Sequence, residues 1–246
     1  MMSKMPVHRG SDLADKPVRW AWDSHAVSGG LTVIGGEPGI GKSLLGCDLA
    51  ARWSAHLPMP DGSPNPLDGP ATVMIMSADD DLHSTIAPRL RAHGAGEDRV
   101  LVCDNDRWPL ELSGDGLRLL EDRLVATGSS VLILDPLVAY LPDSPAALPA
   151  VQQLAIRRDI TVIGMACLAP GSQEELAWQV REMAGDLAFT LTREADGEDG
   201  NVPVLTAVKN KLGPALAPPL SFTIGTDPVH GVGQLSWEEP RTLVAG

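Results

Sequence analysis

The stretch Gly36-Glu37-Pro38-Gly39-Ile40-Gly41-Lys42-Ser43 has the composition and spacing of a complete phosphate-binding loop. The apolar run 31–34 before it predicts a buried parallel strand, and residues 44–53 after it predict a helix. A loop between a strand and a helix is the setting in which this motif holds the phosphates of a nucleotide. The alternative interpretation is an ordinary glycine-rich turn.

Each residue type in this stretch suits a nucleoside triphosphate. The glycines let backbone N–H groups turn toward the phosphates, because they lack a Cβ atom. The Lys42 ammonium is expected to neutralise phosphate charge, and the Ser43 hydroxyl to bind Mg²⁺. The following helix points unsatisfied N–H groups and a positive dipole end at the anion. The predicted nucleotide-binding residues are Gly36, Glu37, Pro38, Gly39, Ile40, Gly41, Lys42, Ser43 and Leu44.

An aspartate is the second residue of the predicted magnesium site. Residues 131–134 form an apolar run that ends in Asp135. A central parallel strand beside a phosphate loop is expected to carry a carboxylate to the metal in this way. We assign Asp135 and Ser43 to Mg²⁺ on this basis. The alternative interpretation is that Asp135 only caps the turn that begins at Pro136.

Length and composition predict one compact domain. The chain has 246 residues, of which 43% are hydrophobic, and this is enough to bury a large core. We expect residues 1–20 to be a partly ordered lead and residues 21–246 to be a single domain. No apolar run approaches the roughly 20 residues that span a bilayer, and residues 1–15 lack the apolar core of a signal peptide. We therefore expect a cytoplasmic protein without membrane contact.

The cysteines and the net charge argue against several classes of site. Cys47, Cys103 and Cys167 are far apart and odd in number, so the sequence predicts neither a disulfide framework nor a zinc site, but reduced core residues. The net charge of −13, with only five lysines, means that attraction to nucleic acid is not a property of the average surface. Any nucleic-acid binding needs a local patch, and the simpler interpretation is that the acidic surface keeps the protein soluble.

Beyond the loop, strand and helix patterns alternate and then give way to several strands with short turns. This order predicts an α/β fold with a mostly parallel central sheet, extended by antiparallel strands at the C-terminal end. Ligands of such sheets bind at the carboxyl ends of the strands. The predicted strands are 72–77, 100–103, 131–135, 160–167, 187–192, 202–208, 219–224 and 233–237, and the predicted helices are 80–93, 116–126, 148–157 and 173–184.

The order of these motifs resembles the RecA-like P-loop ATPases, and within them the RepA-like hexameric helicase branch of AAA family ATPases. The resemblance runs from Val18-Arg19-Trp20-Ala21-Trp22 to about Ile224. Its specific parts are the phosphate loop, Ser77-Ala78-Asp79-Asp80-Asp81, the strand ending at Asp135-Pro136, and Val208-Lys209-Asn210-Lys211-Leu212-Gly213-Pro214. It implies ATP and Mg²⁺ as ligands, with ATP held between the subunits of a homo-oligomeric ring or filament.

Two lysines near the C-terminal end are candidate phosphate ligands. Lys209 and Lys211 stand at i and i+2 in a predicted strand, so their side chains are expected to project to the same side. The resemblance implies that such lysines reach across a subunit boundary to the γ-phosphate of the neighbouring ATP. The alternative interpretation is a solvated pair on an edge strand that discourages aggregation.

Three aspartates follow the predicted strand 72–77. The resemblance places a general base at Asp79, where relatives commonly have glutamate, with Asp80 as a second candidate. A carboxylate there is expected to orient or deprotonate the attacking water. Asp79 is one methylene shorter than glutamate, so slow ATP hydrolysis is an alternative outcome. The alternative is that these aspartates cap the helix predicted over 80–93, which is the interpretation we prefer for Asp81.

The chain departs from this family pattern elsewhere. Where relatives carry a polar γ-phosphate sensor, this chain has Met165-Ala166-Cys167-Leu168-Ala169-Pro170, and an arginine of relatives is replaced near Gly185-Asp186. These departures weaken the prediction of helicase activity more than the prediction of nucleotide binding. A transferase that uses the same loop would need an arginine-bearing lid. The one candidate is 89–99, whose arginines we interpret instead as the exposed face of a helix.

Two functional hypotheses follow. The first is an oligomeric ATPase that drives movement or remodelling on DNA in replication or recombination, with single-stranded DNA and the proteins of those processes as partners. The second is a nucleotide-binding regulatory or structural module with weak or no hydrolysis. Few aromatic residues mark a single-strand groove. The resemblance implies that polymer-contacting loops lie in the segment that holds Trp178, so 170–182 is our best candidate for such contact, against the alternative that this tryptophan faces the core.

Overall fold

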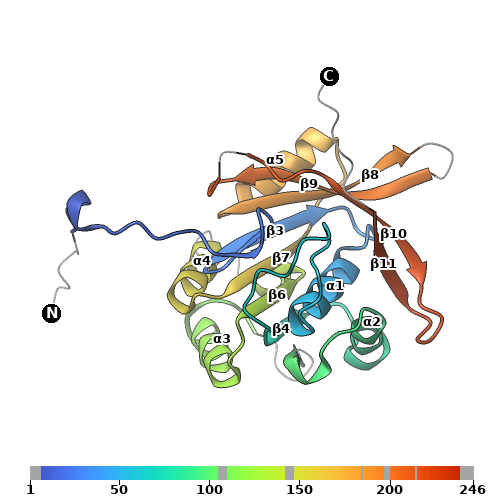
Figure 1. The fold of residues 1–246 in the computed structure, drawn as a ribbon, viewed down its shortest axis with the longest axis horizontal. Coiled ribbons are helices and arrows are strands. Elements are labelled where there is room, and N and C mark those ends of the chain that lie inside the picture. Colours follow the sequence, from blue (N-terminus) through green and yellow to red (C-terminus); the bar gives the residue numbers. More distant parts are fainter. Residues whose placement is uncertain are drawn as a thin grey trace.

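The computed structural model describes residues 7–104, 110–141, 147–183, 185–196, 200–213 and 215–238. Within them, a nine-stranded sheet with the order β11-β10-β9-β8-β3-β7-β6-β4-β5 forms the centre of the molecule (Figure 1). Strands from β8 to β5 in this order run parallel, and β9, β10 and β11 are antiparallel to their neighbours. The predicted mostly parallel sheet with an antiparallel C-terminal extension is therefore confirmed.

The described strands and helices have the following bounds. The strands are β1 Trp20–Trp22, β2 Ala26–Val27, β3 Gly30–Gly36, β4 Val73–Ser77, β5 Val100–Cys103, β6 Val131–Asp135, β7 Thr161–Cys167, β8 Leu187–Asp196, β9 Gly200–Asn210, β10 Leu220–Thr226 and β11 Gly233–Trp237. The α-helices are α1 Lys42–Ser54, α2 Ala87–Ala92, α3 Gly114–Thr127, α4 Ala147–Arg158 and α5 Gln173–Met183. Shorter helical segments are η1 Gly10–Asp12, η2 Leu82–Ile86, η3 Glu97–Arg99 and η4 Leu137–Tyr140.

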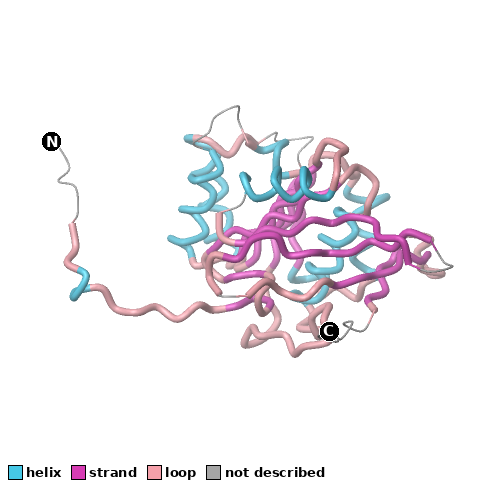
Figure 2. Tube along the Cα trace, turned by 90° about the horizontal axis from the view of Figure 1, so that it is seen from above, coloured by secondary structure: helices cyan, strands magenta, loops and turns pink. Residues whose placement is uncertain are grey.

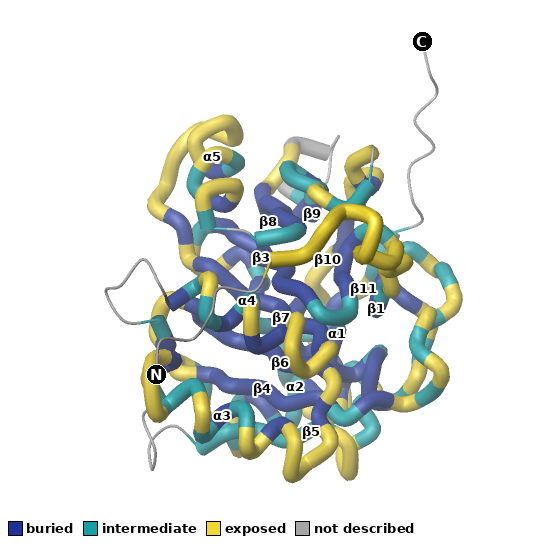
Figure 3. Tube along the Cα trace, turned by 90° about the vertical axis from the view of Figure 1, so that its left-hand side faces the viewer, coloured by how far each residue is buried: buried dark blue, intermediate teal, exposed yellow. Residues whose placement is uncertain are grey.

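Helices cover both faces of the sheet, and the strand sequences explain why (Figure 2). Successive side chains of a strand point to opposite faces. In β4, Val73 and Ile75 join the buried cluster that includes α1 and α2, whereas Met74 and Met76 join the one that includes α3, α4 and α5. The parallel strands are consequently apolar on both sides, and Figure 3 shows them as the buried centre of the fold.

The segment predicted as one helix over 80–93 is divided. Asp81 is the N-cap and accepts hydrogen bonds from the backbone N–H groups of His83 and Ser84, so no helical turn begins before it. The π-helical turn η2 comes first, and α2 follows with Pro88 in its first turn. Because Pro88 has no N–H, it has no hydrogen bond to give to the carbonyl of Ser84, where a continuous α-helix would need one.

A small two-stranded sheet, β1–β2, precedes β3 and was not among the predicted elements. The His25 ring beside it is stacked between two aromatic rings. The ring centroids of Trp22 and His25 lie 3.9 Å apart, and those of His25 and Phe189 lie 5.3 Å apart. Burial lowers the pKa of His25, although the backbone carbonyl of Asp23, which its Nδ1 contacts at 2.6 Å, acts in the opposite direction. Residues 7–19 before this sheet are exposed and extend away from the body (Figure 1).

The last two strands form a hairpin at the edge of the sheet, and this hairpin packs against helices α1 and α2 (Figure 1). β10 pairs with β9 at Leu220–Leu205 and at Ser221–Val204, whereas β10 and β11 pair along five positions. On the helix side, the Trp237 indole N–H donates to Asp48 Oδ2 of α1 at 2.9 Å. The Leu235 N–H donates to His93 Nε2, just after α2, at 3.0 Å. The hairpin is therefore fixed against both helices that follow the carboxyl ends of β3 and β4.

The described helices include none with the length and apolar character needed to cross a membrane.

Candidate phosphate-binding site

The predicted phosphate loop lies at the carboxyl end of β3, in the middle of the sheet. Gly36, the last residue of β3, pairs with Cys167 of β7 and with Leu191 of β8. A Cβ at Gly36 would lie 2.5 Å from the Leu191 carbonyl oxygen, so this close approach requires glycine. Gly41 is the N-cap of α1 with φ 106°, in the region that favours glycine, and the Ile40 side chain is buried beneath the loop.

Lys42 holds the loop in shape from inside. Its side chain is 5% exposed, and its ammonium donates to the carbonyl oxygens of Gly36 at 3.0 Å and Glu37 at 2.8 Å. Burying a lysine is expensive unless its charge is used. An ammonium carries three N–H groups, one more than these two carbonyls accept. The position is therefore suited to an anion placed over the loop.

Ser43 and Asp135 come together as the predicted metal ligands. Both side chains line the same cavity, the Ser43 hydroxyl is close enough to the Asp135 carboxylate to act on its pKa, and Asp135 is 9% exposed. Burial raises the pKa of Asp135, and the nearby carboxylates of Asp80 and Asp79 raise it further, against the opposite effects of Ser43 and Lys42. A hydroxyl and a carboxylate in an acidic neighbourhood are the oxygen ligands that Mg²⁺ prefers. The residues present therefore fit a magnesium ion.

A cavity of about 440 Å³ lies over the loop. Its lining includes six of the nine residues predicted to bind nucleotide and both of the acidic residues given separate roles, Asp79 as base and Asp135 as metal ligand. The volume falls in the range of small-ligand pockets, which is roughly 300–1,000 Å³. The predicted residues that line it are Pro38, Gly39, Gly41, Lys42, Ser43, Leu44, Asp79 and Asp135. Gly36, Glu37 and Ile40 support the loop without lining the cavity.

The three aspartates after β4 have different environments. Asp79 is exposed and lines the cavity. Asp80 forms an ion pair with Arg89, in which Arg89 Nη1 lies 2.8 Å from Asp80 Oδ2. Asp81 faces the backbone as the N-cap of η2, as the sequence predicted for it. Register explains why they lie near the metal ligands, since Ser77 at the end of β4 pairs with Asp135 at the end of β6.

Lys209 and Lys211 do not line this cavity. Lys209 pairs with Ala188 near the start of β8, whereas the phosphate loop is level with Leu191 farther along that strand. The Lys209 ammonium donates to the backbone carbonyl of Arg181 at 3.0 Å. β9 ends at Asn210, so Lys211 follows the strand, and the expectation that both lysines project from one strand is wrong. Neither lysine is among the described residues that line the phosphate cavity.

Four residues that the sequence did not assign to the site also line the cavity: Arg89, Cys167, Ile224 and Gly233. The interpretation of Arg89 as part of an exposed helical face is wrong, because its side chain is 25% exposed and paired with Asp80. The expectation that Cys167 is a core residue is also wrong, because this thiol is exposed at the end of β7. Of the other cysteines, Cys47 is buried and Cys103 is partly buried.

Trp178 of α5 is 62% exposed, so the alternative that it faces the core is wrong. The aromatic side chain lies on the outer side of a helix whose inner side packs against β3 and β8 through Leu176 and Val180. It is exposed within the segment proposed for polymer contact.

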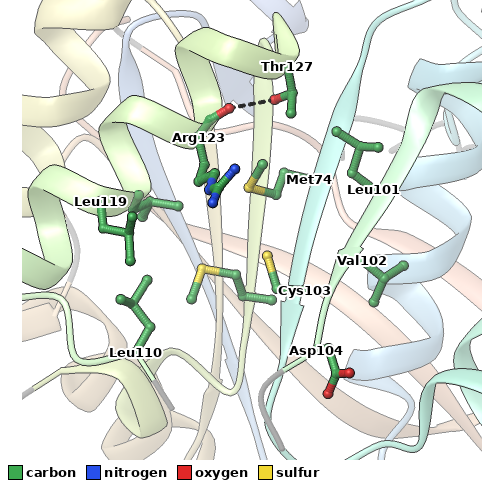
Figure 4. A pocket seen from close by; sticks show the side chains of 11 residues that line it. Met74, Leu101, Val102, Cys103, Asp104, Leu110, Leu119, Arg123 and Thr127 are labelled. Carbon is green, nitrogen blue, oxygen red and sulfur yellow. Dashed lines mark hydrogen bonds between the residues drawn. The ribbon is translucent and has the colours of Figure 1, made fainter. Parts of the chain in front are cut away.

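A second cavity, of about 460 Å³, lies at the β5 edge of the sheet under α3 (Figure 4). Apolar and sulfur-containing side chains dominate its wall, among them Met74, Met76, Leu101 and Cys103. Arg123 and Thr127 of α3 also line it, and the dashed line in Figure 4 is the helix-internal bond from the Thr127 hydroxyl to the Arg123 carbonyl. This cavity lies away from the phosphate loop, and its described lining offers no pair of magnesium ligands.

Comparison with known families agrees with this geometry. A family model described as an AAA domain matches residues 3–159, which is more than half of the chain. The matched segment contains the phosphate loop, Asp79 and Asp135. Among curated proteins, none matches the sequence.

Proposed function

The chain belongs to the family of AAA domains, and we propose that it is an oligomeric, magnesium-dependent ATPase of the RepA-like helicase branch. Family membership makes it a nucleotide-binding ATPase with a P-loop fold. The single observation that carries the finer proposal is the convergence of Lys42, Ser43, Asp135 and Asp79 on one cavity at the carboxyl end of the parallel strands. Sheets of this type bind their ligands at that end.

In the proposed complex, the triphosphate lies over the loop with its charge compensated by Lys42, the loop N–H groups and the N-terminal end of α1. Mg²⁺ is held by the Ser43 hydroxyl, with Asp135 beside it. When bound, the ion neutralises charge that develops on the phosphate oxygens. The chain itself supplies orientation, because the buried Lys42 and Asp135 side chains have little freedom to move.

Asp79 is the proposed group that positions the attacking water and accepts its proton. Its exposure on the cavity wall leaves the carboxylate accessible to a water molecule there. Asp80 is less suited to this role, because its carboxylate is engaged by the Arg89 guanidinium. This arrangement favours general-base catalysis by Asp79 with Asp80 as a second-rank candidate.

Lys209 and Lys211 are proposed to act in trans. Their position outside the cavity of their own subunit is what a role at a neighbouring subunit requires, in a ring or filament with ATP between subunits. Burial and the nearby Lys211 both lower the pKa of Lys209, against the opposite effects of Glu182 and Asp186, and an anion brought to it by a neighbouring subunit would favour its charged form. This pair therefore supports an oligomer whose site is completed by the partner.

Single-stranded DNA is the proposed polymer, and the exposed Trp178 on α5 is the proposed stacking residue, in a replication or recombination assembly. The net charge of −13 favours the alternative of a regulatory or structural module. So does Cys167, which stands where a strongly polar γ-phosphate sensor is expected. In that alternative the same cavity binds ATP with weak or no turnover.

Steady-state hydrolysis tests these proposals together. ATP turnover is measured with Mg²⁺, with and without single-stranded DNA, beside an ATP-binding titration and a Lys42→Ala control. Turnover lost in the control supports the ATPase, and stimulation by DNA supports the motor. Tight binding without turnover favours the regulatory module. Absence of binding by the wild-type protein contradicts both.

A further inference from the structure

Arg89 is a second cation at the phosphate cavity. Its side chain comes from α2, lines the cavity, and pairs with Asp80 at 2.8 Å. The two side chains are 25% and 24% exposed, so the ion pair is mostly shielded from solvent, while Arg89 still lines the cavity. Arg89 also acts electrostatically on Cys47, as Asp135 does, which places both charges around the same buried thiol.

The charges on the cavity wall give this cation a use when a triphosphate binds. Among the described lining residues, Lys42 and Arg89 are positive and Asp79 and Asp135 are negative, and Asp80 stands just behind Arg89. A triphosphate remains negatively charged after Mg²⁺ binds. The Lys42 ammonium is anchored to two carbonyl oxygens of the phosphate loop. It therefore stands beside the phosphates that the loop N–H groups are expected to hold. Arg89 pairs with Asp80, the residue next to Asp79. It therefore stands near the proposed base, where the terminal phosphate and the attacking water are expected.

The backbone of Arg89 is fixed by the hairpin that closes the cavity. His93 contacts the Arg89 carbonyl oxygen through Nδ1 at 2.7 Å and accepts the Leu235 N–H of β11 through Nε2 at 3.0 Å. Both ring nitrogens are therefore used, and the proton lies on Nδ1. The hairpin formed by β10 and β11 also contributes Ile224 and Gly233 to the wall. The β10–β11 hairpin therefore contacts the end of α2 and also forms part of the cavity wall.

We propose that Arg89 leaves Asp80 for the terminal phosphate of the bound nucleotide, and that this exchange makes the site prefer nucleoside triphosphates to diphosphates. The inference rests on the proposed nucleotide site. A guanidinium binds phosphate oxygens through two parallel N–H groups, and the same geometry serves carboxylates, so Asp80 holds Arg89 in readiness.

Affinities for Mg-ATPγS and Mg-ADP test the inference in four full-length proteins: wild type, Arg89→Ala, Arg89→Lys and Arg91→Ala. Arg91 is a matched control on the same helix, because its exposed guanidinium pairs with Glu97 at 3.1 Å and does not line the cavity. We expect Arg89→Ala to weaken ATPγS binding by about 10- to 100-fold, the usual range for a lost charge-assisted hydrogen bond. The affinity for ADP should change by less than about threefold, and Arg89→Lys should lie between.

A further variant keeps the test decisive if Arg89→Ala fails to fold. Asp80→Asn releases the guanidinium without removing it, and we expect unchanged or tighter ATPγS binding. Equal losses for ATPγS and ADP in the Arg89 variants, or no loss for either, would overturn the inference while leaving the nucleotide site intact. Failure of the wild-type protein to bind either nucleotide overturns both the inference and the proposed function.

Discussion

The Ser43 hydroxyl lies beside the Asp135 carboxylate and acts to lower its pKa, so the first turn of α1 and the end of β6 meet at the phosphate cavity. If this pair holds the metal, Asp135→Asn keeps the shape and removes the charge that attracts it. We expect Mg-ATP binding to weaken by at least about tenfold, as for the loss of a charged partner, while ATP binding in EDTA changes little. Titrations with and without Mg²⁺ measure this difference. An equal loss in both conditions would assign Asp135 to the architecture of the loop instead.

Cys167 offers a chemical probe of the cavity. Burial raises the pKa of the Cys47 thiol to about 12 and also raises the pKa of Cys103, so both remain protonated and unreactive. The exposed Cys167 lines the phosphate cavity. We expect a maleimide to modify Cys167 first in the native protein, and Mg-ATP to slow the modification severalfold. Peptide mass mapping identifies the site, with Cys167→Ser as the control. Equal rates with and without nucleotide would show that the ligand leaves this thiol open.

Lys211, which follows β9, allows a test of catalysis between subunits. Lys42→Ala and Lys211→Ala are each expected to lose most ATP hydrolysis, because one removes the loop cation and the other the proposed trans cation. Mixed oligomers of the two variants contain interfaces that combine an intact loop with an intact Lys211. They should recover part of the wild-type rate. Arg118→Ala, on the exposed side of α3, is the control for changed surface charge. No recovery in stable mixed oligomers would place Lys211 outside the reaction.

The Asp81 cap supports the segment that carries Arg89. Its carboxylate accepts the Ser84 hydroxyl and backbone N–H groups at 2.6 and 2.7 Å, and these hydrogen bonds lower the pKa of Asp81. The folded state therefore favours the ionised form. The stabilisation is present above the unfolded pKa of about 3.9 and is lost as pH falls through the lower folded value. We expect Asp81→Ala to lower the melting temperature at pH 7 and Asp81→Asn to restore most of it, since both Asp and Asn cap helices.

The stacked His25 predicts a dependence on pH near neutrality. Burial lowers its pKa below the usual value of about 6.5, so the unfolded chain binds the proton more readily than the folded chain. The free energy of unfolding should therefore fall as the pH drops below about 6.5. His25→Phe keeps an aromatic ring between Trp22 and Phe189, and urea unfolding at pH 8 to 5.5 should show a shallower fall for this variant. An identical slope would mean that other groups dominate acid unfolding.

Local patterns were enough to predict the sheet and the phosphate loop, and they also selected Ser43 and Asp135, which the structure places on one cavity. Gly36 to Ser43 is read within one strand-loop-helix unit, and Asp135 is found because parallel strands end at one edge. The division of the predicted 80–93 helix was missed, although Pro88 marks it in the sequence, because a proline has no N–H to donate within a helix. Asp81 was interpreted only as a cap near the helix start.

The rest of the cavity depends on tertiary packing. Arg89 reaches it because of its pairing with Asp80, and Ile224 because a hairpin almost two hundred residues after the loop folds back onto α1. Neither contact has a periodic signal in the sequence. Cys167 was misplaced for a different reason, since its apolar neighbours indicate a buried strand and only the end of β7 is exposed. The division into a lead and a single domain remains a prediction.

The place of β7 in the sheet has a consequence for how this chain is recognised. The family match ends at residue 159, yet β7, which follows it, separates β3 from β6 and pairs with both. The strand that ends in the phosphate loop and the strand that ends in Asp135 are therefore neighbours of a segment that the match does not include. A fragment cut at the matched boundary lacks the middle of its own sheet. Changes in β7 can consequently disable the nucleotide site while the matched sequence stays intact.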